Sequence, residues 1–378
     1  MAGIAALGEL SARRAPAAAW ELSLASPDDD ADLRALLRRA VIPGAVRVAF
    51  TREPQYAAGE GVAGARDVTV LARRAGEVVG MGRCTVRTLH RNGALRRIGY
   101  LGELRIAPGT SAAARLLRDG YGRLTTAVAD TGVEGFITSI ATDNVRARRV
   151  LEFGPRMGLP EYRPLASLVT LVAPVRRRTP RVADDAAAAG DPADATQFVR
   201  DHAREAQLTL PWDDAQWPAL HAHDVAPHDM CVARRDGRIV AAAAVWDQRP
   251  FRQTVIDGYA GALQLTRPLL NVIQRLRGLP PLPHPGHILA QGALLGVTVP
   301  HARDWPSLWR ALQQRAAVQG LSWLTLTRDA SDPQLSALRT LLRARAYHTV
   351  LYEVVWHDRP SWPDRWDGRR FAPEVGLL

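Results

Sequence analysis

The chain has 378 residues, which is too long for one ordinary domain and sufficient for two domains with separate cores. No run of about 18 apolar residues is present that would span a bilayer, and the charges near the N-terminus do not fit a signal peptide. We therefore expect a cytoplasmic protein without a membrane partner. The only cysteines, Cys84 and Cys231, lie in apparent strands, which argues against a disulfide framework and against a cysteine zinc site.

The net charge of +11 is typical of proteins that bind nucleic acid, but all 49 basic residues are arginines and they are spread along the chain. Together with the many alanines, this indicates a bias in codon composition. We therefore do not expect nucleic acid as a partner. Three histidines and one aspartate in the segment His221–His228 are irregularly spaced around Pro227, so we expect no metal site there.

The first predicted helix follows Ser26, which precedes three aspartates as an N-cap residue does. Its apolar residues have helical spacing, at Leu33, Leu36, Leu37 and Val41. A polar segment, Phe50-Thr-Arg-Glu-Pro-Gln-Tyr56, comes next.

A hairpin is predicted in the segment 70–81, because two strand-like runs flank a turn at Gly76. Its sequence Val70-Leu-Ala-Arg-Arg-Ala-Gly matches Cys231-Val-Ala-Arg-Arg-Asp-Gly in the second half. This match aligns Ala72 with Ala233. The chain therefore contains an internal repeat.

The segment Tyr100-Leu-Gly-Glu-Leu-Arg-Ile-Ala-Pro108 reads as a buried strand that leads through small residues into a helix from about Ala112. A strand that leads to the exposed backbone amides of a helix N-terminus is a device for holding phosphate. We therefore expect a phosphate-bearing cofactor.

A second buried strand, Phe136-Ile-Thr-Ser-Ile-Ala-Thr-Asp143, precedes an amphipathic helix that Asp143 or Asn144 caps. Together with the earlier strand, this block resembles the GNAT superfamily of N-acetyltransferases over roughly residues 20–175. In that superfamily Asn-x-x-Ala follows the fifth strand, here Asn144 and Ala147. The glycine loop of the family is altered here to Gly109-Thr-Ser-Ala-Ala-Ala-Arg115.

The resemblance implies acetyl-CoA as cosubstrate. The fourth and fifth strands of the family separate to receive its pantetheine arm, and the loop after the fourth strand holds its diphosphate. The residues predicted to bind the cofactor are Leu104, Arg105, Ile106, Ser111, Ala112, Ala113, Ala114, Arg115 and Asn144.

The resemblance also implies a catalytic base at Glu103, where several GNAT enzymes carry a glutamate that deprotonates the amine. Partial burial would raise the pKa of Glu103 and suit it to this role. The alternative is an ion pair with Arg97 or Arg105. Many family members place a tyrosine acid at the position of Leu151, so Tyr162, just beyond that helix, is the candidate acid here.

The alternative interpretation of Tyr162 is a packed aromatic side chain at the start of a strand. In GNAT folds the region between the first two helices borders the acceptor site, so Arg52, Glu53 and Tyr56 are the candidate substrate-binding residues. The alternative is an ordinary polar loop. The acceptor itself would be a small-molecule or peptide amine.

The fold class predicted is α/β of the α+β type, with two tandem GNAT-like domains, each a twisted, mixed, mostly antiparallel sheet flanked by helices. The fifth strand recurs in the second half when Phe136 is aligned with Trp323. The counterpart of the fourth strand in the second half is Ile288–Val299, and no glycine loop follows it. The second domain is therefore expected to lack cofactor. The predicted division is an N-terminal extension (1–19), a first domain (20–175), a linker (176–195), a second domain (196–357) and a C-terminal arm (358–378).

One further segment of the second half concentrates polar and aromatic residues after a strand, at Trp246, Asp247, Gln248 and Arg249. These groups either bind a ligand, or Trp246 packs in the core while Asp247 and Arg249 pair at a turn. For the whole chain we expect transfer of an acetyl group from coenzyme A to an amine by direct attack, in a monomer or homodimer. The alternative is a non-catalytic GNAT-like protein for ligand binding or interaction, which the altered loop and Leu151 favour.

Overall fold

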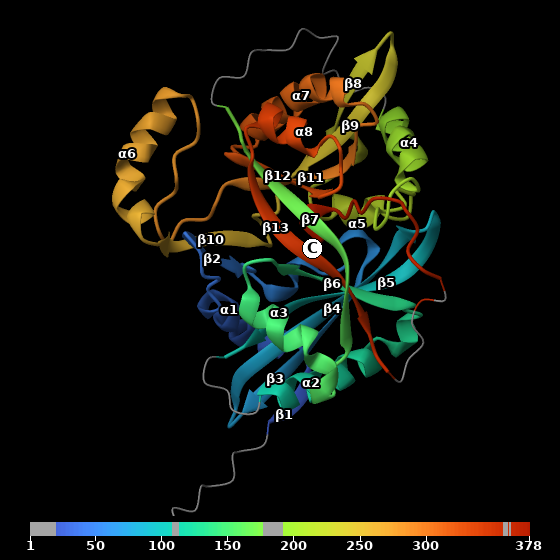
Figure 1. Cartoon of the computed structure of the whole chain (residues 1–378), viewed down its shortest axis with the longest axis vertical. Helices are drawn as coiled ribbons and strands as arrows, with labels where there is room; N and C mark the ends of the chain where they lie inside the picture. Colours follow the sequence, from blue (N-terminus) through green and yellow to red (C-terminus); the bar gives the residue numbers. More distant parts are fainter. Residues whose placement is uncertain (1–19, 108–112, 177–191, 358–361, 363) are drawn as a thin grey trace, which may run out of the picture.

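A computed structural model describes residues 20–107, 113–176, 192–357, 362 and 364–378. Within these residues eleven strands form one continuous sheet, in the order β1-β3-β4-β5-β6-β13-β7-β12-β11-β9-β8 (Figure 1). The first half consists of β1 (Glu21–Leu24), α1 (Asp30–Arg39), β2 (Val46–Thr51), β3 (Arg66–Arg74), β4 (Glu77–Arg91), β5 (Ala94–Ile106), α2 (Ala113–Ala127), β6 (Gly135–Ala141), α3 (Val145–Glu152) and β7 (Glu161–Pro174).

The second half begins with two helices and then repeats the order from β3 onward, with an insertion. It consists of α4 (Pro192–Ala203), α5 (Trp217–His221), β8 (Met230–Arg235), β9 (Arg238–Trp246), β10 (Gln253–Tyr259), α6 (Ala262–Leu276), β11 (Gln291–Thr298), α7 (Trp305–Val318), β12 (Trp323–Asp329), α8 (Leu335–Leu342) and β13 (Arg345–Val355). The insertion contains β10 and α6, and β10 pairs with β2 of the first half in a separate two-stranded sheet.

The two hairpins, β3–β4 and β8–β9, have the same register. Ala72 pairs with Gly80 and Ala233 with Ala241, and in both hairpins a register shift follows immediately. Each turn contains two successive residues with positive φ, which is the backbone of a type I′ hairpin turn. The predicted repeat, with Ala72 aligned on Ala233, is therefore confirmed.

The fifth strands are equivalent in an alignment slightly different from the one predicted. Ile98 of β5 pairs with Gly135 of β6, and Gln291 of β11 pairs with Trp323 of β12. Trp323 therefore corresponds to Gly135 and not to Phe136, so the predicted alignment is wrong by a single position. Such a shift exchanges the two faces of a strand, and the buried runs of both strands conceal that difference from the sequence.

The last strand of each half crosses to the other half. Strand β7 follows β6 and α3 in sequence, yet it pairs with β12 on one side and β13 on the other. Strand β13 closes the second half in sequence, yet it pairs with β6 of the first. This reciprocal exchange joins the two halves in one sheet, and Figure 1 shows β7 and β13 side by side at its centre.

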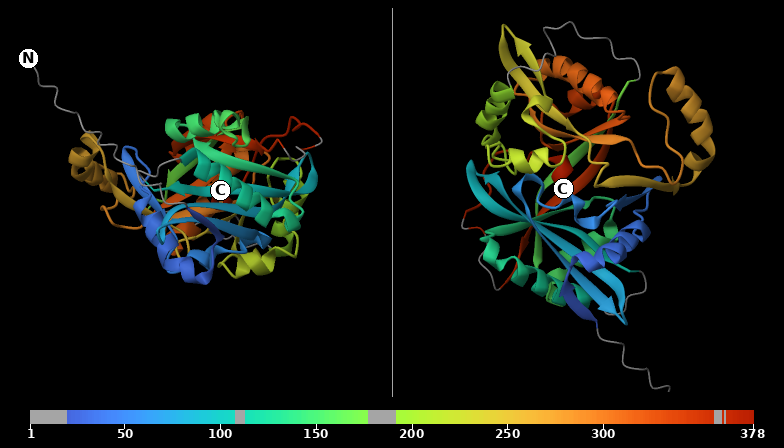
Figure 2. Two further views of the ribbon diagram at one scale, coloured as in Figure 1. Left: turned by 90° about the horizontal axis from the view of Figure 1, so that it is seen from below. Right: turned by 180° about the vertical axis from the view of Figure 1, so that it is seen from behind.

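Helices cover the sheet on both faces. Helices α2 and α3 pack on the first half, and α7 and α8 pack on the second. A third core contains residues of both halves, among them Leu89, Ile137, Trp246, Leu295 and Leu351, and joins them beneath α4, α5 and the C-terminal segment. The end of the chain lies at the centre of the molecule, whereas α6 stands away from the body (Figures 1 and 2).

The structure confirms the predicted fold class, a mixed and mostly antiparallel sheet with flanking helices in a tandem arrangement. The predicted domain limits stay a prediction, and the exchanged strands mean that neither half has a separate sheet. The predicted N-terminal extension lies outside the described residues, as do most of the linker and residues 358–361 and 363 of the C-terminal arm. Among the helices described, none combines the length and the apolar character needed to cross a membrane.

Candidate functional site

A β-bulge in β5 positions Glu103. Gly102 pairs with Arg83 and Arg105 pairs with Met81, so Glu103 and Leu104 together face the single residue Gly82 of β4. The backbone of Glu103 has φ 51°, a left-handed conformation that costs energy for a residue with a side chain. A bulge of this kind redirects a side chain and releases backbone groups from the strand ladder.

The bulge lies just beyond the point where β5 and β6 stop pairing. Their parallel pairing runs from Ile98 to Tyr100. Gly99 makes this contact close, because a Cβ atom there would lie 2.6 Å from the ring of Phe136. The hydroxyl groups of Tyr100 and Ser139 then meet at 2.8 Å across the two strands.

The carboxylate of Glu103 is held by two other residues that the sequence analysis placed in the site. The Nε atom of Arg52 donates to Oε1 of Glu103 at 2.6 Å, and the hydroxyl group of Tyr56 donates to Oε2 at 2.8 Å. Burial acts to raise the pKa of Glu103, but the guanidinium groups of Arg52 and Arg83 outweigh it and hold the pKa at about 2.

The predicted rise in the pKa of Glu103 is therefore wrong, because its ionic partners dominate over burial. The ion pair itself also differs from the alternative considered, since Arg52 is the partner and not Arg97 or Arg105. A carboxylate of such low pKa is a weak base and a permanent anion near neutrality.

A row of polar side chains continues the site along β4. Arg83, Thr85 and Arg87 alternate along the strand, so they lie on one face of the sheet while Cys84 and Val86 pack on the other. The Nη2 atom of Arg83 lies 2.8 Å from a carboxylate oxygen of Asp67, which also accepts from Thr85 at 2.7 Å. This row was not among the predicted site residues.

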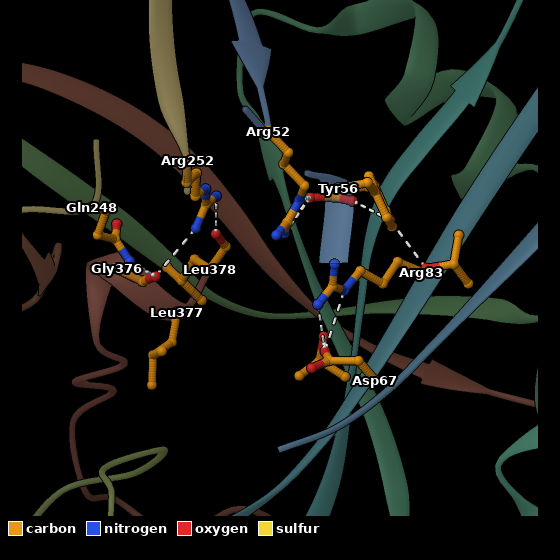
Figure 3. A network of polar contacts seen from close by, with 12 residues as sticks. Arg52, Tyr56, Asp67, Arg83, Gln248, Arg252, Gly376, Leu377 and Leu378 are labelled. Carbon is orange, nitrogen blue, oxygen red and sulfur yellow. Dashed lines mark hydrogen bonds and ion pairs between the residues drawn. The ribbon is translucent and has the colours of Figure 1, made fainter. Parts of the chain in front are cut away.

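The second half completes the site with Arg252. Its guanidinium group donates to the main-chain oxygens of Gly376 and Leu378, at 3.2 Å and 2.6 Å, and Gln248 also donates to Gly376 at 2.8 Å (Figure 3). Burial lowers the pKa of Arg252, and the charges of Arg52, Glu103 and Arg83 act on it as well. The network therefore combines side chains from both halves with the C-terminal segment.

Glu53 follows Arg52 in the sequence, but its side chain contacts α1 and not Glu103. Its carboxylate pairs with Arg34, at 2.5 Å, and with Arg38. Its main-chain N–H and C=O groups both bond to the side-chain amide of Gln253, at 2.9 Å each. Its contacts are those of the polar loop that the sequence analysis gave as the alternative, and they fasten this loop to the second half.

The predicted cofactor residues fall into three groups. Leu104, Arg105 and Ile106 line an apolar pocket between β5 and α2. Ala113 begins α2, and Ala114 and the exposed Arg115 follow in its first turn. Ser111 and Ala112 lie outside the described residues.

Asn144 caps α3 as predicted. Its Oδ1 atom accepts from the N–H of Ala147 at 3.2 Å. The side chain is exposed, so its described contact is with the helix it begins.

Tyr162 lies in the apolar core beneath α2 and α3. Its hydroxyl group bonds to that of Tyr121, and its ring packs edge-on against Tyr352. Burial and the neighbouring Tyr121 raise the pKa of Tyr162 well above 10, which makes it a weaker acid. This environment matches the packed aromatic side chain that the sequence analysis gave as the alternative.

The second half contains the same bulge but with different surroundings. Gly296 and Val297 of β11 face Ala243 of β9, and Gly296 has φ 62°. The N–H of Gly296 donates to the carboxyl group of Glu374, at 3.2 Å to each oxygen, and Asp329 at the end of β12 accepts from the N–H of Phe371 at 3.1 Å. The C-terminal segment thus bonds to both strands where they separate.

The polar segment after β9 has the contacts of a buried tryptophan followed by an ion pair at a turn, which was the second of its two predicted interpretations. Trp246 is fully buried in the shared core, and Asp247 pairs with Arg249 at 2.6 Å. The residues of this region that reach the site are Gln248, Arg252 and Gln253, of which only Gln248 was among those singled out. The alternation of Arg83, Thr85 and Arg87 is a sequence signal that could have identified this row, whereas Arg252 and Gln253 have no such signal.

Comparisons with known structures agree with this fold. No protein-family model and no curated protein matches the sequence. A GCN5-related N-acetyltransferase from Sphaerobacter thermophilus superposes with a TM-score of 0.51 at 14% identity, covering 90% of this chain and 96% of that one. A tandem GNAT protein from the clavulanic acid biosynthesis pathway gives 0.51 at 11%, covering 90% and 100%.

A third solved structure is similar over nearly the whole chain. The N-myristoyltransferase of Saccharomyces cerevisiae, with bound myristoyl-CoA, gives a TM-score of 0.58 at 10% identity and covers 98% of this chain and 90% of that one. At these identities the likeness concerns the fold. The chain has the fold of the GCN5-related N-acetyltransferases, in a tandem arrangement.

Proposed function

We propose that the protein transfers an acyl group, acetyl in the simplest case, from coenzyme A to an amine, and that the first half carries the reaction. The observation that carries this proposal is the contrast between two equivalent bulges. At Glu103 the bulge adjoins an ionic network, whereas at Gly296 the backbone N–H is bonded to Glu374 of the same chain. The first half is therefore the one with a backbone arrangement suited to a thioester.

The cosubstrate fits the first half in two respects. The strands β5 and β6 stop pairing at Tyr100, and Leu104 to Ile106 follow on an edge that can bond to an amide-containing arm such as pantetheine. Beyond them lies the N-terminus of α2, whose first-turn N–H groups and Arg115 suit a diphosphate. The bulge at Glu103 and Leu104 supplies backbone amides for the thioester oxygen.

The role proposed for Glu103 is to hold the amine. Oε1 faces both Nε and Nη2 of Arg52, at 2.6 Å and 2.5 Å, whereas Oε2 accepts from Tyr56 and keeps a lone pair, so Oε2 can accept a hydrogen bond from the acceptor nitrogen. The surrounding guanidinium groups disfavour a charged ammonium and favour the neutral, nucleophilic amine. They also stabilise the thiolate that leaves, and this thiolate takes up the proton that the nitrogen loses on forming the amide, so its release does not depend on a tyrosine at the position of Leu151.

Transfer is tested by release of thiol from acetyl-CoA in the presence of a panel of amines, with mass spectrometry of the product. Thiol release that depends on the amine, with one acetyl group gained by the product, supports the proposal. Binding of acetyl-CoA without turnover of any amine would favour the non-catalytic alternative, which the altered loop and Leu151 support.

A further inference from the structure

Four arginine side chains gather on the face of the sheet beside Glu103. Arg52 and Arg83 are each paired with a carboxylate, Glu103 and Asp67 respectively. Arg87 and Arg252 have no side-chain carboxylate within ion-pair distance among the described residues; both donate to main-chain oxygens of the segment 376–378. Glu60 lies nearby, but it is exposed at the edge.

Two guanidinium nitrogens in this region have no hydrogen-bond partner in the part of the chain that the structure describes. They are Nη1 of Arg83, a residue 5% exposed, and Nε of Arg87. A buried donor left without a partner costs free energy comparable to a lost hydrogen bond. Burial, together with neighbouring guanidinium groups, lowers the pKa values of Arg87 and Arg252 to about 10, although the charges of Asp67 and Glu103 act in the opposite direction.

The position of Arg87 relates these donors to the proposed acceptor site. Burial raises the pKa of Tyr100, and the charges of Arg252 and Arg87 both act to lower it. The hydroxyl group of Tyr100 meets Ser139 where β5 and β6 stop pairing. Arg83 contacts the ring of Tyr56, which in turn donates to Glu103. The unpaired donors therefore lie on the same side of the sheet as the carboxylate that would hold the amine.

We propose that the acceptor carries an anionic group, a carboxylate, close to its amine, and that Arg87 binds this group with the help of Arg83 and Arg252. This inference rests on the proposed function, because it specifies the acceptor of that same site. A planar guanidinium group matches a carboxylate in charge and in bidentate geometry. The acceptor class is then the α-amino acids and related amino acids, and Arg87 is a specificity residue.

The test compares matched amines. Each α-amino acid of a panel is assayed for thiol release beside its amide and its decarboxylated amine, and phosphoethanolamine beside ethanolamine tests phosphate as the anion. The expected result is a kcat/KM for the amino acid about 10- to 100-fold above that of its amide, the size of one charge-assisted hydrogen bond. Equal values for acid and amide would overturn the proposal, and a preference for phosphoethanolamine would replace carboxylate by phosphate.

Arg87→Gln should remove this preference, Arg87→Lys should keep part of it, and Arg96→Gln, at an exposed pair with Glu134, should leave it unchanged. Because the guanidinium group of Arg87 is desolvated without a paired carboxylate, Arg87→Gln is expected to melt no lower than the wild type. If Arg87→Gln does not fold, Arg252→Gln serves in its place.

If no amine is turned over, the binding of an amino acid tests the inference instead. The melting temperature of the wild type should then rise with an amino acid, with desulfo-CoA present, and this rise should be lost in Arg87→Gln. If no amine is acetylated but the rise is seen, the proposed transfer fails and the anion site stands. If no amino acid raises the melting temperature in that case, the anion site fails too.

Discussion

Glu103 and Gly296 occupy the same bulge in the two halves of the sheet, equally far beyond the first parallel pairs at Ile98 and Gln291, with φ values of 51° and 62°. The strain at Glu103 is offset by a side chain that Arg52 and Tyr56 hold in place. Gly296 adopts the conformation without strain, and its N–H is bonded to Glu374. The two halves thus share the backbone conformation of the bulge but differ in the groups that the bulge contacts.

Replacing Glu103 by Gln should test its role as hydrogen-bond acceptor. Because the pKa of Glu103 is held at about 2, its carboxylate does not titrate between pH 5 and 9. The pH profile of kcat/KM in the wild type should therefore have no limb that disappears in Glu103→Gln, although the variant should be less active. A limb near neutrality that the substitution abolishes would restore Glu103 as the base.

The same substitution should lower stability. Glu103 has a folded pKa below its unfolded value, so its stabilising contribution is present above about pH 4.5 and is lost as the pH falls toward 2. The difference in melting temperature between wild type and Glu103→Gln should shrink between pH 5 and pH 3. Glu134→Gln, at the exposed pair with Arg96, should change stability by less than about 1 kcal/mol.

Tyr162→Phe should leave the rate of acyl transfer within about twofold of the wild type, because the hydroxyl group is bonded to Tyr121 inside the core. The lost hydrogen bond should cost about 1 kcal/mol of stability, and Tyr121→Phe should cost a similar amount. Thermal melts and thiol release measure the two effects. A large loss of kcat with an unchanged melting temperature would contradict this account of Tyr162.

Glu374→Gln should stabilise the protein at alkaline pH. Burial raises the pKa of Glu374 to about 8, since the N–H of Gly296 and the charge of Arg328 compensate only in part. A carboxyl group with a raised folded pKa contributes most below its unfolded pKa of about 4.5, and this contribution falls as the pH rises toward 8. The variant should therefore gain in melting temperature over the wild type at pH 8.5 and not at pH 4.5; the opposite trend would contradict the buried position.

Asn144→Ala should lower stability by about 1 kcal/mol, since the cap on Ala147 is lost, and Asn144→Asp should retain the cap. The affinity for acetyl-CoA distinguishes capping from the predicted contact with the cofactor. A similar affinity in all three proteins indicates capping alone. A loss of tenfold or more in both variants would indicate a contact between Asn144 and the cofactor.

Features of the fold and of the site that depend on local sequence pattern were predicted. The hairpin around Gly76 and its copy around Gly237 follow from turn residues and alternation, and both form with their turns at the predicted glycines. Arg52, Tyr56 and Glu103 were predicted as site residues, and the structure brings them together.

Features that depend on distant partners were not predicted. Alternation along a strand tells which face is buried but not which strand lies beside it, so the exchange of β7 and β13 has no signal in either strand. The environment of Glu103 was misjudged for the same reason, because its pKa depends on Arg52 and Arg83, which belong to other segments of the chain. Arg252 reaches the site only because the insertion in the second half packs against β2.

The most direct test of the account is a calorimetric titration of acetyl-CoA into the wild type and into two matched variants, Arg115→Asp and Ser307→Asp. Each variant places a carboxylate at the third residue of a helix, α2 in the first half and α7 in the second. The account predicts about one equivalent bound, loss of binding in Arg115→Asp, and an unchanged isotherm in Ser307→Asp. Absence of heat in the wild type, two equivalents, or loss of binding in Ser307→Asp alone would contradict it.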